Sequence, residues 1–220
     1  MSNKTIWSKI FKILNLKITQ KSYSPLNWTT SFECLIMVIL SANTTDKMVN
    51  KVSSKLFKES PSPSHFLKKF DIETLQEAIK PLGLWRNKSK NILKTCKILE
   101  EDFKGEVPSK LNDLLGLPGV GPKTARVVAG LLFGGNYFPT DTHIKRVLRR
   151  WRITSFEDPL TITLQIEKEL KGKDLMLINR AILRYAREIC TARKHIMRNC
   201  PICSSLNLAQ LHPFEEENKI

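Results

Sequence analysis

Two short polar motifs carry the side chains of this chain that are best suited to chemistry, Lys123 and Asp141. Lys123 follows the glycine-rich turn LPGVG and the helix-starting Pro122, so it lies in the first turn of a predicted helix. The positive end of the helix dipole, together with any burial, disfavours an ammonium group there and favours the neutral amine, which is the nucleophilic form. A lysine that only contacts phosphate is the alternative, and position alone does not decide between the two.

Asp141 opens another predicted helix, in the motif PTDTH. The same dipole keeps its carboxylate ionised, although an aspartate at such a position is usually a structural cap. His143 could act as a general acid or base, but a solvent-facing or hydrogen-bonded histidine is the commoner case. A basic stretch follows, with a solvated face as its default interpretation and a phosphate-contacting rim as the alternative: Lys145, Arg146, Arg149, Arg150 and Arg152.

A helical hairpin from Leu114 to Gly130 must position Lys123. We expect Ser109 to cap its short first helix, and glycines to permit the positive φ and close backbone approach of the turn. The second helix then leaves N–H groups at its N-terminus, where they bind a phosphate without any side-chain charge. An ordinary helical hairpin is the alternative, but the full LPGVGPKTA string is much more specific. The residues predicted to face the phosphate are Gly119, Val120, Gly121 and Thr124.

The remaining elements are predicted to be helices, which makes the chain all-α. Asp71 can cap one helix, and the segment from Phe32 to Leu40 is apolar on every side, as in a central helix wrapped by others. Breaks at 23–27 and 133–140 separate a middle block, residues 25–135, from flanking segments 1–24 and 136–220. Apolar residues recur at helical spacing in three stripes: Ile92, Cys96, Leu99 and Phe103; Ile144, Val147, Leu148 and Trp151; and Leu175, Ile178, Ile182, Tyr185 and Ile189.

The charge of the chain points to a polyanionic partner. The 220 residues carry a formal net charge of +15 and a sequence pI near 9.7, for which DNA is the commonest match. An AT-rich genome is the alternative cause, because 25 of the 36 basic residues are Lys. Ten of the eleven arginines, however, lie between Arg126 and Arg198, and arginine is the better phosphate ligand.

Cysteine usage and hydropathy favour a reducing cytoplasm, and we also expect a monomer associated with the nucleoid of a bacterium. The five cysteines do not form the pattern of a disulfide framework, and no signal peptide precedes them. The longest apolar run, Cys34 to Leu40, is far shorter than the roughly 20 residues that span a bilayer, so we expect no membrane partner. The first 22 residues could form a targeting helix, but a basic amphipathic helix docked on the fold is the favoured interpretation.

These motifs together resemble the endonuclease III family of DNA glycosylases. The hairpin LPGVGPKTA, the later TDTH and the earlier ILSANTTD carry the resemblance, which runs from about Tyr23 to the last cysteines. It implies a two-domain helix-hairpin-helix fold, in which a six-helix domain and a domain formed by both chain ends flank a DNA-binding cleft.

The resemblance also implies a bifunctional glycosylase and abasic-site lyase acting on oxidised pyrimidines in duplex DNA. Lys123 would attack C1′ of a flipped-out nucleotide, expel the base and form a Schiff base, after which β-elimination breaks the strand. Asp141 would stabilise the charge that develops on the sugar. Arg146 would contact DNA, and Asn43, where the family usually has Gln, would fill the gap left by the base.

Cys190, Cys200 and Cys203 resemble the iron–sulfur loop of that family but depart from it in two respects. The first gap is nine residues instead of six, and the fourth cysteine position is Ala209. A [4Fe-4S] cluster is therefore doubtful, with His195 or His212 as a possible fourth ligand off the family spacing. The pair Cys200 and Cys203 could equally form a zinc corner or be inert.

Three other functions stay open at this point. A mismatch-directed glycosylase with weak lyase activity would keep the fold and change the base preference. A non-catalytic hairpin protein that binds DNA or scaffolds repair partners would need neither Lys123 nor Asp141. An enzyme impaired by loss of the cluster would bind abasic sites weakly.

Overall fold

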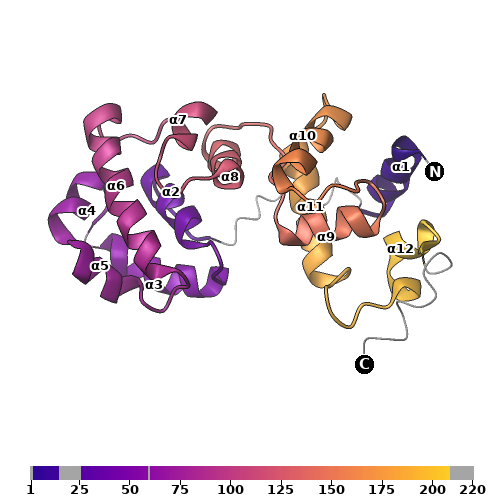
Figure 1. The fold of residues 1–220 in the computed structure, drawn as a ribbon, viewed down its shortest axis with the longest axis horizontal. Coiled ribbons are helices and arrows are strands. Elements are labelled where there is room, and N and C mark those ends of the chain that lie inside the picture. Colours follow the sequence, from indigo (N-terminus) through magenta and orange to yellow (C-terminus); the bar gives the residue numbers. More distant parts are fainter. Residues whose placement is uncertain (1, 15–25, 59, 209–220) are drawn as a thin grey trace. The chain divides into compact units, whose positions relative to one another are not determined.

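A computed structural model describes residues 2–14, 26–58 and 60–208 of the chain (Figure 1). Within these ranges the chain forms twelve α-helices and one 3₁₀ helix, and no strand. The all-α prediction is therefore confirmed. No helix in the described part of the chain has the length and apolar character that crossing a membrane requires.

Backbone contacts divide the chain into two compact units, each described here by itself. The middle unit is Ser24–Gly135, and the terminal unit combines Met1–Tyr23 with Asn136–Ile220. In its described part the middle unit has seven helices, one more than the six that the resemblance implies, since the five-residue α7 counts separately. They are α2 Ser31–Leu40, α3 Asp46–Lys58, α4 Pro63–Lys69, α5 Ile72–Ile79, α6 Trp85–Phe103, α7 Leu111–Leu115 and α8 Pro122–Leu132.

Helix α2 is the centre of the middle unit. Every residue from Phe32 to Leu40 is buried, and α3, α6 and α8 pack against it, as the uniformly apolar sequence predicts (Figure 1). Helix α6 packs on α4 and α5 and buries Ile92, Cys96 and Leu99 completely. Desolvation by burial raises the pKa of the Cys34 and Cys96 thiols to about 12, so both behave as apolar core groups.

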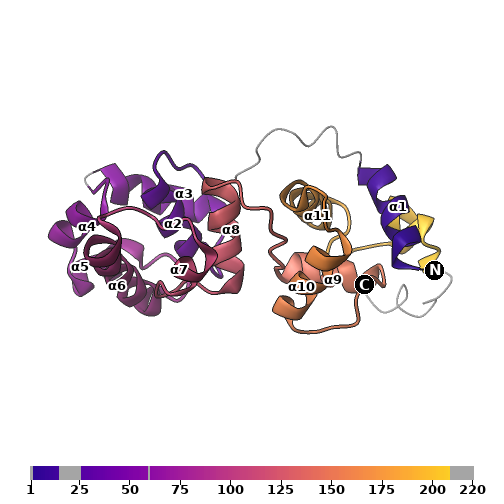
Figure 2. The ribbon, with the colours of Figure 1, turned by 90° about the horizontal axis from the view of Figure 1, so that it is seen from above.

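The terminal unit brings the N-terminal helix onto the last helices of the chain. Its elements are α1 Asn3–Leu14, α9 Thr142–Arg150, α10 Pro159–Glu169, α11 Leu175–Glu188, η2 Met197–Asn199 and α12 Pro201–Ser205. Ile6, Trp7 and Ile10 of α1 are buried in the core of this unit, where α1 contacts α11 and α12 (Figure 2). The prediction of a docked amphipathic helix is thus confirmed.

Several of the described helices begin with a side-chain cap, and two predictions near helix ends were wrong. Asp71 caps α5 in a capping box with Thr74, as predicted. Ser109 does not cap α7, because the helix starts one residue later and Lys110 holds the cap position without a side-chain bond. Ile189 is 46% exposed, because α11 ends at Glu188 and the chain then turns to bury Cys190 in place of Ile189.

Candidate active site

Lys123 lies exposed in the first turn of α8, directly after the hairpin turn. Gly119 has φ +82°, a left-handed conformation, and an added Cβ there would lie 3.0 Å from Asn91 Cβ. The Val120 amide donates to Leu117 O at 3.0 Å, and the buried Val120 side chain anchors the turn. Because no described side chain caps α8, the first amides of that helix remain available to an anion.

The hairpin therefore has the geometry of a phosphate cradle. Gly121 is exposed with open space around its Cα, and Thr124 is half-buried one residue beyond Lys123. The Thr95 hydroxyl donates to Pro118 O at 2.9 Å, which ties the turn to α6. The structure thus places together four predicted contacts, at Gly119 to Gly121 and Thr124, and it places Lys123 beside them.

Asp141 is the N-cap of α9 in the terminal unit. Its Oδ1 accepts a hydrogen bond from the Ile144 amide at 2.7 Å, and the carboxylate is half-buried at the positive end of the helix dipole. The backbone before it is fixed as well, because Asn179 Nδ2 donates to Pro139 O at 2.8 Å and the buried Thr163 and Thr140 hydroxyls are bonded at 2.9 Å. The position of the carboxylate is therefore rigidly determined.

Asn43 stands on an exposed loop between α2 and α3, in a left-handed conformation with φ 53°. Its carbonyl oxygen lies against Gly83, where an added Cβ would come within 2.9 Å of it. The next residue, Leu84, is also left-handed, with φ 59°, and is 56% exposed. Sequence reasoning missed Leu84, because an apolar residue outside every helical stripe gives no local signal.

Lys88 holds the loop that contains Asn43 through hydrogen bonds. Its side chain is only 4% exposed, and its Nζ donates to Leu40 O at 2.8 Å and to Thr44 Oγ1 at 3.0 Å. Desolvation by burial lowers the pKa of Lys88 to about 8. The sequence does contain a signal for this residue, since Lys88 lies one helical turn before the buried Ile92 and so falls on an apolar stripe.

Arg146 and Arg150 of α9 are committed to hydrogen bonds inside the terminal unit. Arg146 Nη2 donates to Ala186 O at 2.8 Å and Cys190 O at 3.0 Å, and desolvation is the main cause that lowers its pKa. Arg150 Nη1 donates to Thr191 O at 3.0 Å and contacts Cys190 Sγ at 3.2 Å. The contact between Arg146 and DNA stays a prediction.

A second group of reactive side chains lies in the terminal unit. Cys190, His195, Cys200 and Cys203 bring their potential ligand atoms within 4.8 Å of one another, and the three cysteines are buried. The cluster is compatible with metal binding. The sequence predicted the three cysteines and named His195 among candidates for the fourth ligand, whereas Ala209 and His212 lie outside the described residues.

The thiols and the imidazole perturb one another strongly. Hydrogen bonding to Cys190 is the largest cause that raises the pKa of His195 to about 9, and the same partner lowers the pKa of Cys200 and raises that of Cys203. Tyr185, whose hydroxyl lies 3.3 Å from Cys200 Sγ, has its pKa raised, chiefly by burial.

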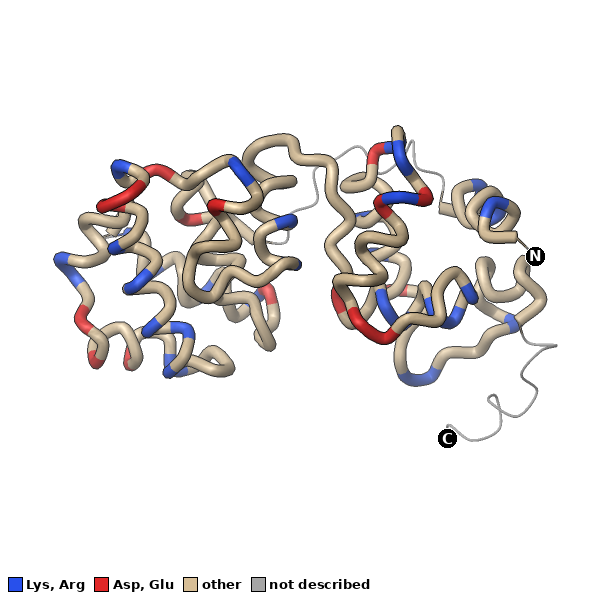
Figure 3. The backbone as a smooth tube through the Cα atoms, turned by 45° about the horizontal axis from the view of Figure 1, so that its top comes forward, with Lys and Arg blue, Asp and Glu red and all other residues tan. Residues whose placement is uncertain are grey.

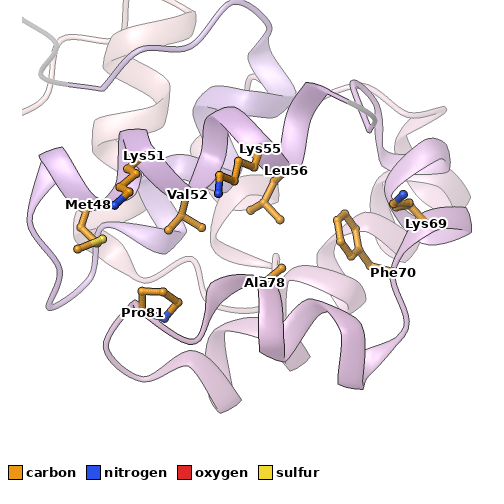
Figure 4. Close-up of a pocket in the computed structure, with 9 residues that line it drawn as sticks. All are labelled: Met48, Lys51, Val52, Lys55, Leu56, Lys69, Phe70, Ala78 and Pro81. Carbon is orange, nitrogen blue, oxygen red and sulfur yellow. The ribbon is translucent and has the colours of Figure 1, made fainter.

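A groove of about 610 Å³ lies on the middle unit, and none of the residues above lines it (Figure 4). It is lined by α3, by the end of α4 with Phe70, by α5 and by Pro81, and Lys51, Lys55 and Lys69 are its charged groups. Among the described residues that line it there is no acidic side chain, cysteine or histidine. Basic residues occur on helices of both units (Figure 3), and four of the nine residues of α9 are Lys or Arg.

Comparison with known proteins defines the class of the fold and site. Residues 36–171, which include both Lys123 and Asp141, match the model of the HhH-GPD superfamily of base excision DNA repair proteins. The chain is 36% identical to endonuclease III of Buchnera aphidicola over 96% of its own length and 94% of that protein. It is 39% identical to endonuclease III of Bacillus subtilis over 79% of each chain.

The fold agrees with a solved structure of an endonuclease III trapped as a covalent intermediate with DNA. The TM-score is 0.85 at 31% identity, over 92% of this chain and 94% of that one. The chain belongs to the endonuclease III family. It is thus a base-excision repair enzyme of the DNA glycosylase and lyase class.

Proposed function

We propose that this enzyme removes oxidised pyrimidines from duplex DNA and cleaves the resulting abasic site through a Schiff base on Lys123. The observation that carries the proposal is the exposed amine of Lys123 in the first turn of α8, next to an uncapped helix N-terminus. An enzyme that forms a covalent bond to a sugar needs an accessible nucleophile held beside the phosphate that fixes that sugar.

Lys123 supplies the covalent step. Its neutral amine attacks C1′ of the damaged nucleotide, and the bond from C1′ to the base breaks as the base leaves with a proton. The C1′–O4′ bond then breaks as the ring oxygen takes up a proton, and the nitrogen forms an iminium with C1′, which acidifies the C2′ proton. Removal of that proton breaks the C3′–O bond and releases the strand on the 3′ side, and water finally frees the lysine.

Asp141 supplies charge and proton transfer. Its carboxylate is fixed by the Ile144 amide at the N-terminus of α9, so it stabilises positive charge that develops on the sugar. Because the Ile144 amide already holds the carboxylate, the Asp141 side chain loses little conformational entropy when the substrate binds. This preorganisation supports a catalytic role in addition to the cap.

Double-stranded DNA is the partner, and the middle unit offers two contact elements for it. The hairpin amides bind a phosphate, and the loops of Asn43 and Leu84 meet the base stack. An exposed leucine in a left-handed conformation is suited to wedge between bases, where an apolar side chain replaces lost stacking. Acting on DNA, the enzyme works at the bacterial nucleoid.

The donor set argues against the [4Fe-4S] cluster that the family resemblance implies. A cubane held by the protein uses four thiolates on four different irons, which keeps the sulfur atoms about 6 Å apart. The described residues offer three thiolates, with Cys190 Sγ and Cys203 Sγ only 3.9 Å apart. No step of the proposed reaction depends on a cluster.

Borohydride trapping tests the proposal directly. The full-length protein is incubated with a duplex carrying one abasic site, and reduction of the iminium should give a covalent protein–DNA product. Lys123→Ala should give none. Lys110→Ala is a matched control, because Lys110 lies at the start of the same hairpin without a side-chain cap bond, and this variant should trap like the wild type.

A parallel assay separates the two activities. Duplexes with one oxidised pyrimidine or one mismatched thymine should show base release only from the first. If the wild-type protein binds the abasic duplex without trapping or nicking it, the lyase assignment fails. Trapping by Lys123→Ala at the wild-type level would instead assign the nucleophile to another residue.

A further inference from the structure

The four side chains of the cysteine cluster have the geometry of a single tetrahedral metal site. A zinc ion bound at about 2.3 Å to sulfur and about 2.0 Å to nitrogen places two thiolates about 3.8 Å apart, and a thiolate and an imidazole about 3.6 Å apart. Cys190 Sγ lies 3.9 Å from Cys203 Sγ, and Cys203 Sγ lies 3.7 Å from His195 Nε2. All four donor atoms fall within 4.8 Å of one another.

We infer that this enzyme binds one zinc ion through Cys190, His195, Cys200 and Cys203, in place of a [4Fe-4S] cluster. The sulfur separation is too long for a disulfide and too short for two corners of a cubane. Three thiolates with one imidazole form a donor set that tetrahedral zinc prefers. His195 therefore replaces the fourth cysteine of the family from inside the loop between Cys190 and Cys200.

The sequence around the ligands fits a closed zinc site. Two residues separate Cys200 from Cys203, and the first of them, Pro201, starts α12. Four residues separate Cys190 from His195. Both intervals are of the length that zinc-binding loops use. The three cysteines are buried and His195 is half-buried, so the four protein ligands fill the coordination sphere and the site is structural rather than catalytic.

Two neighbouring groups support charged thiolates at this position. Three thiolates and a neutral imidazole leave one excess negative charge on a zinc complex, and Arg150 Nη1 lies 3.2 Å from Cys190 Sγ to balance it. The Tyr185 hydroxyl lies 3.3 Å from Cys200 Sγ and accepts a hydrogen bond from the Ile202 amide at 3.0 Å, which leaves its proton for the sulfur. Outer groups of this kind orient metal ligands and tune their basicity.

Metal content of the full-length protein tests the inference. The protein is expressed with iron and zinc both supplied and is purified without oxygen, so that oxidative loss of a cluster cannot imitate a zinc protein. Elemental analysis should give about one zinc per chain, no iron and no acid-labile sulfide. Replacement of zinc by Co²⁺ should produce the visible ligand-field bands of tetrahedral thiolate coordination.

Variants identify the ligands. His195→Ala should lower zinc affinity by more than about 10-fold, and His195→Cys should restore it, which separates loss of a ligand from loss of the fold. His65→Ala is the matched control, because His65 bonds only to Ser62 in the middle unit, and it should keep full zinc content. Arg150→Gln should weaken zinc binding by about 10- to 100-fold while leaving the four ligands in place.

Three results would overturn the inference. The first is iron with inorganic sulfide, or iron alone, in place of zinc. The second is metal-free protein whose three thiols react with a disulfide reagent under native conditions as readily as free cysteine does. The third is unchanged zinc content and an unchanged Co²⁺ spectrum in His195→Ala.

Discussion

Asp141 has a structural and a proposed catalytic role, and two substitutions separate them. Its Oδ1 accepts the Ile144 amide at 2.7 Å and so caps α9. Asparagine keeps an oxygen for this bond and caps helices as well as aspartate, whereas alanine has none. Asp141→Ala should thus lower the free energy of unfolding by about 1.5 kcal/mol, about 1 kcal/mol from the cap and about 0.5 kcal/mol from the helix dipole. Asp141→Asn should lose only the dipole part, about 0.5 kcal/mol.

The rate of base release should depend on the negative charge of Asp141 and not on its helix-capping hydrogen bond. Both substitutions remove the carboxylate, so both should slow the single-turnover release of an oxidised pyrimidine by about 100- to 1000-fold. Enzyme in excess over duplex saturates binding, so the measured rate reports the chemical step. Urea unfolding followed by circular dichroism gives the stability of each variant under the same conditions.

Asp174 is the matched control for this experiment. It caps α11 of the same unit through the Leu177 amide at 2.8 Å. Asp174→Ala should lose the same cap and dipole contributions, about 1.5 kcal/mol of stability, and keep the wild-type rate of base release. The reasoning is refuted if Asp141→Asn reacts at the wild-type rate, or if Asp174→Ala slows base release as strongly as Asp141→Ala.

Three further predictions concern the hairpin, the loop of Asn43 and the N-terminal helix. Gly119→Ala should destabilise the protein by about 1–2 kcal/mol in urea unfolding, because φ is +82° and the new Cβ meets Asn91. Gly121→Ala should leave the stability unchanged, because φ is −83° and the new Cβ enters open space. An equal loss of stability in the two variants would contradict the argument. Between about pH 8 and pH 10.5 the unfolded chain binds more protons at Lys88 than the folded chain does, because burial lowers the folded pKa to about 8. Wild-type stability should therefore gain a contribution as pH rises through this window. Lys88→Met should lack that contribution. If urea unfolding gives the wild type and Lys88→Met the same dependence of stability on pH, the prediction is refuted. Trp7→Phe removes the hydrogen bond from Trp7 Nε1 to Glu169 Oε2 at 3.0 Å and should cost about 1 kcal/mol in thermal unfolding, with an unchanged melting temperature as the contrary result.

Local patterns predicted most of the helices, because helix formation depends on neighbours within one or two turns. The stripe of Ile144, Val147, Leu148 and Trp151 is fully buried, and Asp71 and Asp141 cap the helices that they precede. The predicted cap at Ser109 was wrong, because the helix begins one residue later, at Leu111, and Lys110 holds the cap position.

The metal ligands show the limit of reading spacing alone. Cys190 and Cys200 are separated by nine residues, an interval that matches no family pattern, and so His195 was one of two candidate fourth ligands. The path of the loop decides which side chain turns inward. That path depends on Arg146 and Arg150 holding the carbonyls of Cys190 and Thr191, which are contacts more than forty residues distant in sequence.

The same arginines explain why the inferred metal site and the proposed catalytic carboxylate of Asp141 need not depend on each other, although one helix serves both. Helix α9 has nine residues and spans about 13 Å, with Asp141 at its N-terminus and Arg150 at its other end. The N-terminus is fixed by its own cap and by the bond from Asn179 to Pro139 O. The cysteine loop bonds to the middle and the end of the helix, through Arg146 and Arg150. Replacing one kind of metal centre by another therefore changes what holds the loop, while the carboxylate keeps its position.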